Sequence, residues 1–209
     1  MKRARLLLDR EMPYEVETAY QTLRANLIFE CSEKQTIGII SAKREEGKSL
    51  VAMRLGISLA KAGRKVLLLD ADLRNSAMQA HISVDSGPLR GTSDFLSGQC
   101  TVEDVICSTD VPGLYLIPAG TCEGDPGILF ENARCRELLG ILKKVFDLIL
   151  VDTTALETAV DAAIVARRCD GALLITESGR NRGRDMADPL QLLMRSRCPL
   201  IGVVLTKQP

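Results

Sequence analysis

Tryptophan is absent from the sequence, aromatic residues are scarce, and the positive and negative charges cancel. These features argue against binding to nucleic acid and to anionic membranes. Aromatic residues make up 3% of the 209 residues, which is too few for a base-stacking platform that binds single-stranded nucleic acid. The 27 basic and 27 acidic residues give a formal net charge of zero, so there is no global attraction to nucleic acid or to an anionic membrane. We therefore expect no nucleic-acid partner.

Long hydrophobic runs and paired cysteines are missing too. The longest apolar stretches, such as "VLLLD" and "FDLILVD", are far shorter than a membrane span. No apolar signal-peptide segment follows the basic start "MKRARLLLDR", so we expect a cytoplasmic protein. No C-x-x-C pair occurs, which disfavours zinc and favours reduced thiols acting as small buried hydrophobes. The cysteines are Cys31, Cys100, Cys107, Cys122, Cys135, Cys169 and Cys198.

The remaining composition is that of a globular protein, with 46% hydrophobic and 26% charged residues. The length suits one domain, so we expect residues 1–209 to form a single nucleotide-binding unit. Short aliphatic runs without alternation predict strands of a parallel sheet that is covered on both faces. These runs are 36–41, 65–71, 114–120, 146–152, 171–177 and 200–207.

Segments with helical spacing lie between these strands, at 49–63, 131–146 and 161–170, and a further helix is predicted at 15–30, before the first strand. Residues 75–113, interrupted by Gly87-Pro88 and Gly91, predict an irregular excursion with one short helix near "TSDFLSG". The alternation of strand and helix is typical of a three-layer, doubly wound α/β fold with a mostly parallel sheet, P-loop topology and an extra N-terminal helix.

The first predicted strand leads into "SAKREEGKSL" (41–50), which ends like a phosphate-binding loop. In such a loop the backbone amides and the helix N-terminus hold phosphates, Lys48 reaches the β- and γ-phosphates, and the Ser49 hydroxyl binds Mg²⁺. Ala42 stands where the strict pattern G-x-x-x-x-G-K-[ST] has its first glycine. "GKS" alone is common by chance, but a strand before it and a helix after it favour a P-loop.

Acidic side chains follow two further strands. Asp70 and Asp72, in "LLLDADLR" (67–74), point to the same side of an extended backbone, at the strand edge where open α/β sheets bind ligands. They suit Mg²⁺ or a general base, and Arg74 could screen them or contact phosphate. A solvated turn with a helix-capping aspartate is the alternative. Asp152 ends "DLILVD", a Walker B arrangement. Together the three loops predict a Mg²⁺-nucleotide site.

With these loops in place, the sequence resembles the bacterial protein-tyrosine kinases (BY-kinases) of the CpsD/CapB type, in the MinD/ParA-like branch of P-loop NTPases. The resemblance runs along nearly the whole chain. Its motifs are "AYQTLRANL", "SAKREEGKS", "LLLDADLRNSAM", "GTSDFLSG", "LIPAG", "FDLILVDTTAL", "DAAIVARRCDGALLITESG" and "IGVVLTK". The D-x-D-x-R element is the most specific of them, because it separates these kinases from MinD and ParA.

The resemblance implies ATP-dependent phosphorylation of protein tyrosine in capsule or exopolysaccharide synthesis. One acidic residue would deprotonate the acceptor tyrosine, and Lys43 would reach phosphate across a subunit boundary. The implied catalytic residues are Lys48, Asp70 and Asp72, and the implied Mg²⁺ ligands are Ser49, Asp70 and Asp152. The implied nucleotide-binding residues are Ala42, Lys43, Arg44, Glu45, Glu46, Gly47, Lys48, Ser49, Leu50 and Thr206. The implied partners are ATP and ADP, the cytoplasmic tail of a membrane polysaccharide co-polymerase, and further copies in a ring.

The chain departs from the family pattern at several functional positions. Only Arg24 of the ring motif E-x-x-R-x-x-R is kept, because Thr18 and Gln21 replace the other two residues. The segment like N-P-x-E-L reads Asp125-Pro126-Gly127-Ile128-Leu129, and Thr206 replaces the asparagine of V-L-N-K. The only tyrosines are Tyr14, Tyr20 and Tyr115, and the sequence ends at Gln208-Pro209, without the family's tyrosine-rich tail. These departures favour a nucleotide-gated pseudokinase as the alternative. A MinD/ParA-type ATPase is a further alternative, against which the D-x-D-x-R element argues.

The phosphate-binding loop contains the sharpest departure. Arg44 and Glu45 stand where the family has Pro-Gly, whereas Glu46 matches a family glutamate. We expect the Glu46 side chain to turn outward while its amide serves the loop. Glu45 replaces a glycine, so it tests whether the backbone there needs a positive φ or a close approach to phosphate.

Overall fold

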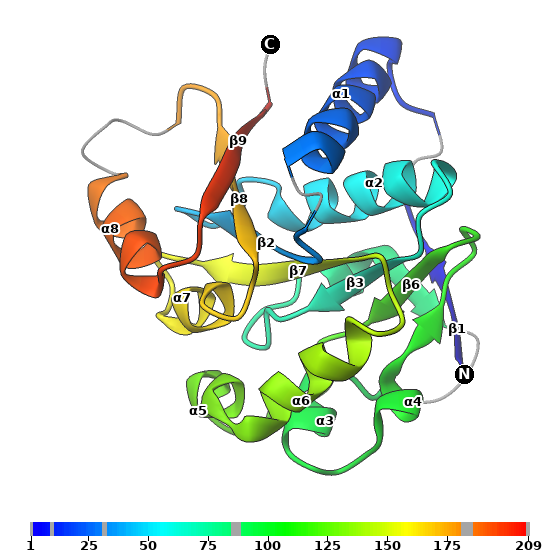
Figure 1. The fold of residues 1–209 in the computed structure, drawn as a ribbon, viewed down its shortest axis with the longest axis vertical. Helices are drawn as coiled ribbons and strands as arrows, with labels where there is room; N and C mark the ends of the chain where they lie inside the picture. The colour runs from blue at the N-terminus through cyan, green and yellow to red at the C-terminus, as the bar shows by residue number, and fades with distance from the viewer. Residues whose placement is uncertain (1, 9–10, 31–32, 85–88, 181–185, 208–209) are drawn as a thin grey trace.

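The computed structural model describes residues 2–8, 11–30, 33–84, 89–180 and 186–207, and a nine-stranded, mostly parallel sheet runs through this part of the chain (Figure 1). The strand order is β4-β1-β5-β6-β3-β7-β2-β8-β9. Among the described residues, β1–β4 and β5–β6 are the antiparallel pairs. The strands are β1 (Lys2–Leu6), β2 (Thr36–Ser41), β3 (Val66–Asp70), β4 (Ile82–Val84), β5 (Cys107–Ser108), β6 (Leu114–Ile117), β7 (Leu148–Ala155), β8 (Gly171–Glu177) and β9 (Leu200–Thr206).

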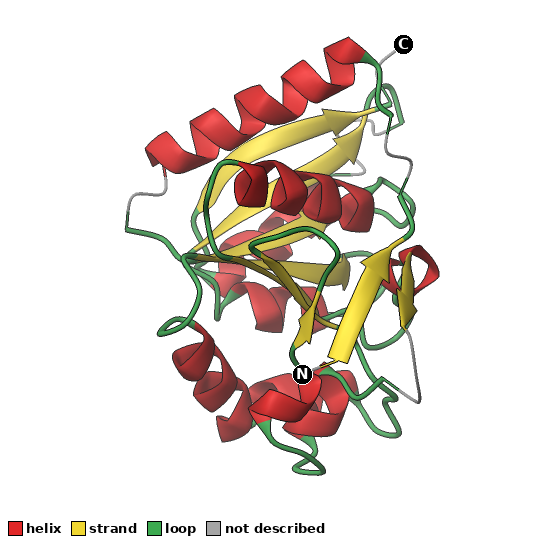
Figure 2. Ribbon diagram, turned by 90° about the vertical axis from the view of Figure 1, so that its right-hand side faces the viewer, coloured by secondary structure: helices red, strands yellow, loops and turns green. Residues whose placement is uncertain are grey.

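Helices lie on both sides of this sheet (Figures 1 and 2). The two longest, α1 and α2, pack against each other on one side, and shorter helices cover the other side. The helices are α1 (Tyr14–Glu30), α2 (Lys48–Lys61), α3 (Thr92–Leu96), α4 (Val102–Val105), α5 (Pro126–Glu131), α6 (Ala133–Leu142), α7 (Asp161–Ala166) and α8 (Ala187–Ser196), with a 3₁₀ turn η1 (Met78–His81). The predicted three-layer α/β fold with an extra N-terminal helix is confirmed.

Each central strand contributes to two hydrophobic cores. In β3, Leu67 and Leu69 pack with the core under α6 and α7, whereas Val66 and Leu68 pack with the core under α2. Alternate side chains of a strand point to opposite faces, so a strand between two helical layers must be apolar at every position. This is why the central strands show as uninterrupted aliphatic runs in the sequence.

The boundaries correct several predicted elements. The helix predicted at 131–146 is two helices, α5 and α6, because the chain turns at Asn132, whose side chain accepts the N–H of Arg134 (3.2 Å) and caps α6. The predicted helix 161–170 ends at Ala166, and the predicted strand 114–120 ends at Ile117. The predicted strand 146–152 is shifted, because β7 begins at Leu148 and continues to Ala155.

The excursion predicted to be irregular, 75–113, contains η1, β4, α3, α4 and β5. No element was predicted at β1 or α8. β1 is short and buries only Ala4 and Leu6, so its sequence pattern is weak, whereas α8 is ten residues long and amphipathic and was overlooked. Cys31, Gly87-Pro88 and Gln208-Pro209 lie outside the described residues.

The described cysteines are all free thiols. Cys107, Cys135, Cys169 and Cys198 are buried as predicted, whereas Cys100 and Cys122 are only partly buried. Within the described ranges, no helix combines the length and the apolarity needed to cross a membrane. That residues 1–209 act as a single unit stays a prediction.

Candidate functional site

The loop between β2 and α2 forms the first wall of the site. β2 ends at Ser41, and α2 begins at Lys48 after Gly47, whose φ of 88° is in the left-handed region. No side chain caps this helix N-terminus, so its first N–H groups point toward any anion in front of the loop. Lys48 and Ser49, in the first turn of α2, are 8% and 9% exposed.

Glu45 adopts a conformation that glycine adopts more easily. Its φ is +61°, one of three positive φ values at non-glycine residues in the described chain. A left-handed conformation costs an L-residue about 1–2 kcal/mol. The backbone at position 45 therefore has the left-handed conformation that glycine adopts most easily. Glu45 adopts this conformation with its side chain exposed.

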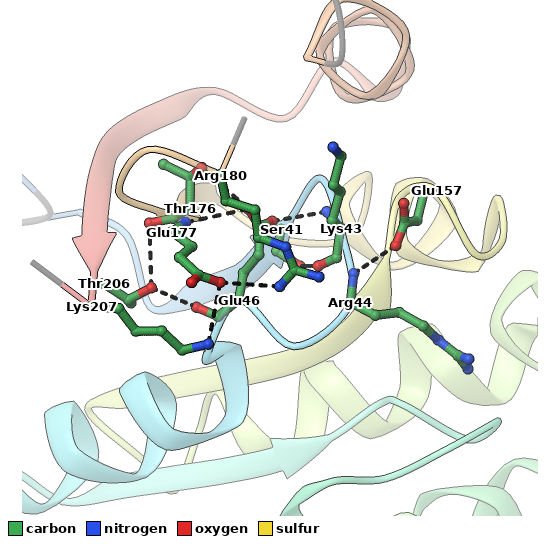
Figure 3. A network of polar contacts seen from close by, with 10 residues as sticks. All are labelled: Ser41, Lys43, Arg44, Glu46, Glu157, Thr176, Glu177, Arg180, Thr206 and Lys207. Atoms are coloured by element: carbon green, nitrogen blue, oxygen red, sulfur yellow. Dashed lines mark hydrogen bonds and ion pairs between the residues drawn. The ribbon is translucent and has the colours of Figure 1, made fainter. Parts of the chain in front are cut away.

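Glu46 is fully buried, so the prediction that its side chain turns outward is wrong. One carboxylate oxygen accepts the N–H of Lys43 (2.8 Å), and the other accepts the Thr176 hydroxyl (3.2 Å) and the Glu177 N–H (3.3 Å). Figure 3 shows these contacts tying the loop to the end of β8. The carboxylate closes the loop from inside, because it accepts the amide of Lys43 within the loop and the amide of Glu177 at the end of β8.

Thr206, at the end of β9, supports the same loop. Its hydroxyl donates to the carbonyl oxygen of Glu46 (2.9 Å), and its methyl carbon lies 3.6 Å from where a Cβ on Gly47 would be. Ala42, where a strict P-loop has glycine, is completely buried, while Leu50 is 42% exposed. The structure thus brings the predicted loop residues together around Gly47, with Leu50 at the periphery.

Asp70 and Asp152 lie side by side at the ends of neighbouring parallel strands. They are Cα partners in the β3–β7 register, and both are fully buried. Burial, and then the negative charge of Asp152, raise the pKa of Asp70 well above its ordinary value. Burial raises the pKa of Asp152 to about 6, although the Lys48 ammonium and the nearby Ser49 hydroxyl oppose this rise. Two buried carboxylates on neighbouring strands repel each other when both are ionised. A bound cation would stabilise both in the ionised form.

The oxygens around this pair fit Mg²⁺. No described residue gives either carboxylate oxygen of Asp152 a hydrogen bond of good geometry, whereas Asp70 accepts the Asp72 N–H (3.1 Å) and the Ser76 hydroxyl. Within the described ranges, no three His, Cys, Asp or Glu side chains form a metal site of their own. An ion bound by Ser49, Asp152, water and phosphate oxygens matches the coordination that Mg²⁺ prefers.

Arg74 points away from the acidic pair. Its guanidinium forms an ion pair with Asp161, at the start of α7, with contacts at 2.5 and 3.2 Å, and it reaches Asp125 at 3.4 Å. It therefore neither screens Asp70 and Asp72 nor extends toward the loop. Asp72 is half-buried and accepts the Asn75 N–H (3.0 Å), so its carboxylate also caps a turn. Asp161, the partner of Arg74, was not predicted from the sequence.

Glu157 is a second residue of the site that was not predicted from the sequence. It follows β7, its N–H donates to the carbonyl oxygen of Ala42 (3.0 Å), and its carboxylate accepts the N–H of Arg44 (2.7 Å). Figure 3 shows this contact on the side of the loop opposite to Thr206. The phosphate-binding loop is therefore held on opposite sides by Thr206, at the end of β9, and by Glu157, in the turn after β7.

Comparison with known proteins identifies a family and relatives to which this chain is similar. The AAA domain family matches residues 34–168. The tyrosine-protein kinase CpsD of Streptococcus agalactiae serotype III (strain NEM316) is 35% identical over 193 residues, which cover 92% of this chain and 83% of that protein.

Two solved structures share the fold. The kinase domain of the Escherichia coli tyrosine kinase ETK superposes with a TM-score of 0.82 and 27% identity, over 92% of this chain and 77% of that one. The septum site-determining protein MinD of Pyrococcus horikoshii OT3, complexed with Mg-ADP, gives a TM-score of 0.67 and 26% identity, over 82% and 69%.

Proposed function

The chain belongs to the bacterial tyrosine-protein kinases of the CpsD type, and from this premise we propose that it transfers the γ-phosphoryl group of ATP to protein tyrosine in capsule or exopolysaccharide synthesis. The observation that carries the proposal is the pairing of Asp70 with Asp152 beside the first turn of α2. It places buried carboxylates next to a helix N-terminus that is shaped for phosphates.

Each residue has a part in this proposal. Lys48 and the loop amides hold the phosphates, while Ser49 and Asp152 hold Mg²⁺. The ion, when bound, neutralises charge between the phosphates and the carboxylates. Asp70 or Asp72 accepts the phenolic proton of the acceptor tyrosine. The raised pKa of Asp70 suits a proton acceptor, whereas Asp72 is the more accessible of the two.

The partners follow from the family resemblance. The kinase would act in the cytoplasm, where the cytoplasmic tail of a membrane polysaccharide co-polymerase would recruit and activate it. Copies of the chain would meet as enzyme and substrate. Of the ring motif only Arg24 is kept, and its guanidinium binds the Ser58 carbonyl and hydroxyl of α2 (3.2 Å each) within the same chain.

A nucleotide-gated interaction module without phosphotransfer is the second candidate, and one observation favours it. The amides of Lys43 and Arg44 already donate to the carboxylates of Glu46 and Glu157. A loop held in this way could bind nucleotide and signal its presence without presenting the phosphates to an acceptor. A MinD-type ATPase is the third candidate, supported by the shared fold.

One experiment separates the candidates. The protein is incubated with Mg-ATP, with and without the cytoplasmic tail of the candidate co-polymerase, while ADP release is followed and phosphotyrosine is mapped by mass spectrometry. A kinase produces phosphotyrosine that is lost in Lys48→Met. ADP release without phosphotyrosine supports the ATPase, and ATP binding without either product supports the interaction module. Phosphotyrosine that persists in Lys48→Met would contradict the kinase site described above.

A further inference from the structure

The three tyrosines of the chain differ sharply in accessibility. Tyr14 is 79% exposed. Tyr20 is partly buried against the core beneath α2, and this burial raises its pKa. Tyr115 is half-buried in β6, where its ring makes an edge contact with Phe146 at 5.3 Å and lies under the Lys65 ammonium. Only the Tyr14 ring stands clear of the body of the protein.

The segment that carries Tyr14 projects from the fold. Tyr14 is the first residue of α1, and residues 14–19 are all exposed. Leu27 is the only fully buried residue of this helix, and Arg24 anchors it to Ser58 of α2. The first turns of α1 therefore make few contacts, which lowers the cost of rearranging them on another surface.

Tyr14 cannot reach the phosphate-binding loop of its own chain. Figure 1 shows the start of α1 at the upper right of the molecule and the loop that precedes α2 on the other side, at the left end of that helix. Tyr14 lies ten positions before Arg24 in α1, a length of about 15 Å at the helical rise. An acceptor at this position must therefore be served by the site of a different copy.

The start of α1 carries acidic side chains, and the rim of the phosphate-binding loop offers the Arg44 cation beside the exposed Glu45. Glu15 and Glu17 follow Tyr14 in the first turn of α1. Arg44, on the phosphate-binding loop, is exposed, and no carboxylate within the described residues pairs with its guanidinium. A tyrosine followed by acidic residues would meet a cation at the rim of the site, which favours encounter in the productive orientation.

We propose that the phosphate acceptor within this chain is the Tyr14 hydroxyl, phosphorylated by the site of a second copy. The inference rests on the kinase function proposed above. The phenolic oxygen attacks the γ-phosphorus of ATP, and a new O–P bond forms. The bond from the γ-phosphorus to its bridging oxygen breaks, and ADP leaves with that electron pair. The phenolic proton passes to Asp70 or Asp72 of the phosphorylating copy.

The test uses two distinguishable forms of the full chain. A ¹⁵N-labelled Lys48→Met chain serves as the acceptor and is mixed with the unlabelled active protein and Mg-ATP. Residues 11–24 form one tryptic peptide containing both Tyr14 and Tyr20, so fragment ions must assign the phosphate. We expect phosphate on Tyr14 of the ¹⁵N-labelled peptide, and loss of this signal to background when the acceptor also carries Tyr14→Phe. The matched controls are Tyr20→Phe and Tyr115→Phe.

A synthetic copolymer of glutamate and tyrosine is included as an independent acceptor. If the copolymer is phosphorylated while Tyr14 is not, the inference is overturned and the kinase function stands. If neither is phosphorylated, with or without the activating tail, the kinase function fails as well. Phosphate on Tyr20 or Tyr115 in place of Tyr14 also overturns the inference.

Charge reversal tests the contact itself. An acceptor with Glu15→Lys and Glu17→Lys should be phosphorylated more slowly by the unmodified enzyme, by about two- to five-fold for each exposed pair lost. An Arg44→Glu enzyme should reverse this preference between the two acceptors. Because both acceptors meet the same enzyme, any general loss of activity in Arg44→Glu cancels in the ratio. An unchanged ratio would show that Arg44 does not contact this segment.

Discussion

At position 45 the chain holds a glutamate in a left-handed conformation, and this makes the residue a sensitive probe of the loop. The φ of +61° costs an L-residue more than it costs glycine. We expect Glu45→Gly to leave the free energy of unfolding unchanged or raise it by up to about 1 kcal/mol, because part of the gain is lost to the freer unfolded chain. Glu45→Val, which is β-branched, should lower it by about 1–2 kcal/mol. Urea denaturation measures both, and equal stabilities would contradict the assigned backbone.

The same position separates conformation from charge in nucleotide binding. Glu45→Gln keeps the side-chain shape and removes the charge, whereas Glu45→Gly also relaxes the backbone. If repulsion from phosphate weakens binding, both variants should tighten ATP binding measured by calorimetry. If only the glycine variant does so, the backbone is responsible.

Glu46 carries more of the loop's stability than its neighbour. Glu46→Ala leaves the Lys43 N–H, the Thr176 hydroxyl and the Glu177 N–H without their acceptor, so we expect a loss of about 1–3 kcal/mol in the free energy of unfolding. ATP binding should weaken as well, because the loop amides lose their fixed positions. Denaturation and calorimetry on one preparation measure both effects.

Glu157→Gln is the matched control for this substitution. Its amide oxygen can still accept the Arg44 N–H at the exposed rim of the same loop, so stability should change little. A Glu46→Ala protein as stable as Glu157→Gln would show that the buried carboxylate does not hold the loop.

At the scale of elements, Asp170 joins β2 to α6 and to the segment after α7. Its carboxylate accepts the N–H groups of Gln35 (3.1 Å) and Thr36 (2.9 Å) and binds the Lys143 ammonium at 2.8 Å. Burial acts to raise the pKa of Asp170, but these partners outweigh it and hold the pKa below its ordinary value. We expect Asp170→Asn to cost about 1–3 kcal/mol of unfolding free energy at pH 7.

The pH dependence of this loss has a definite sign. An aspartate whose pKa is lowered by folding stabilises the protein above its ordinary pKa, and the contribution disappears as the pH falls through the lowered value. The difference between the wild-type protein and Asp170→Asn should therefore shrink below about pH 4. Asp147→Asn is the control, since Asp147 accepts the Lys65 N–H (2.8 Å) but has no ion pair among the described residues. A difference that is constant with pH would contradict the assignment.

At the scale of the whole molecule, local sequence patterns predicted the secondary-structure elements and the strand-end acids. Contacts between residues far apart in the sequence determine which way the side chains of the site point. The central strands, the "GKS" helix start and the acids that end β3 and β7 follow from short-range signals, and parallel strands bring their carboxyl ends together. The inward turn of Glu46 depends on Thr176, which is 130 residues away. The pairing of Arg74 with Asp161 spans 87 residues, and that of Glu157 with Arg44 spans 113. The periodicity of apolar residues predicts helices and strands, but it does not predict which distant side chains pair with each other.

Asp152 links the stability of the whole fold to the proposed function. It is fully buried with a pKa of about 6, and an acid whose pKa rises on folding disfavours the folded state at higher pH. We therefore expect Asp152→Asn to raise the free energy of unfolding of the nucleotide-free protein at pH 8 by about 1–3 kcal/mol.

The same variant should respond less to nucleotide. A ligand at 100 times its Kd stabilises a protein by about 2.7 kcal/mol, and for a chain of this size that corresponds to a rise of about 5–10 °C in Tm. We expect this rise with Mg-ATP in the wild-type protein, its loss in EDTA and in Lys48→Met, and a much smaller rise in Asp152→Asn despite the higher starting Tm. Scanning calorimetry with and without Mg-ATP measures both quantities. If Asp152→Asn lowers the Tm of the nucleotide-free protein and keeps the full Mg-ATP shift, Asp152 is a structural residue, because a carboxylate held in place for a cation must destabilise the fold that lacks one.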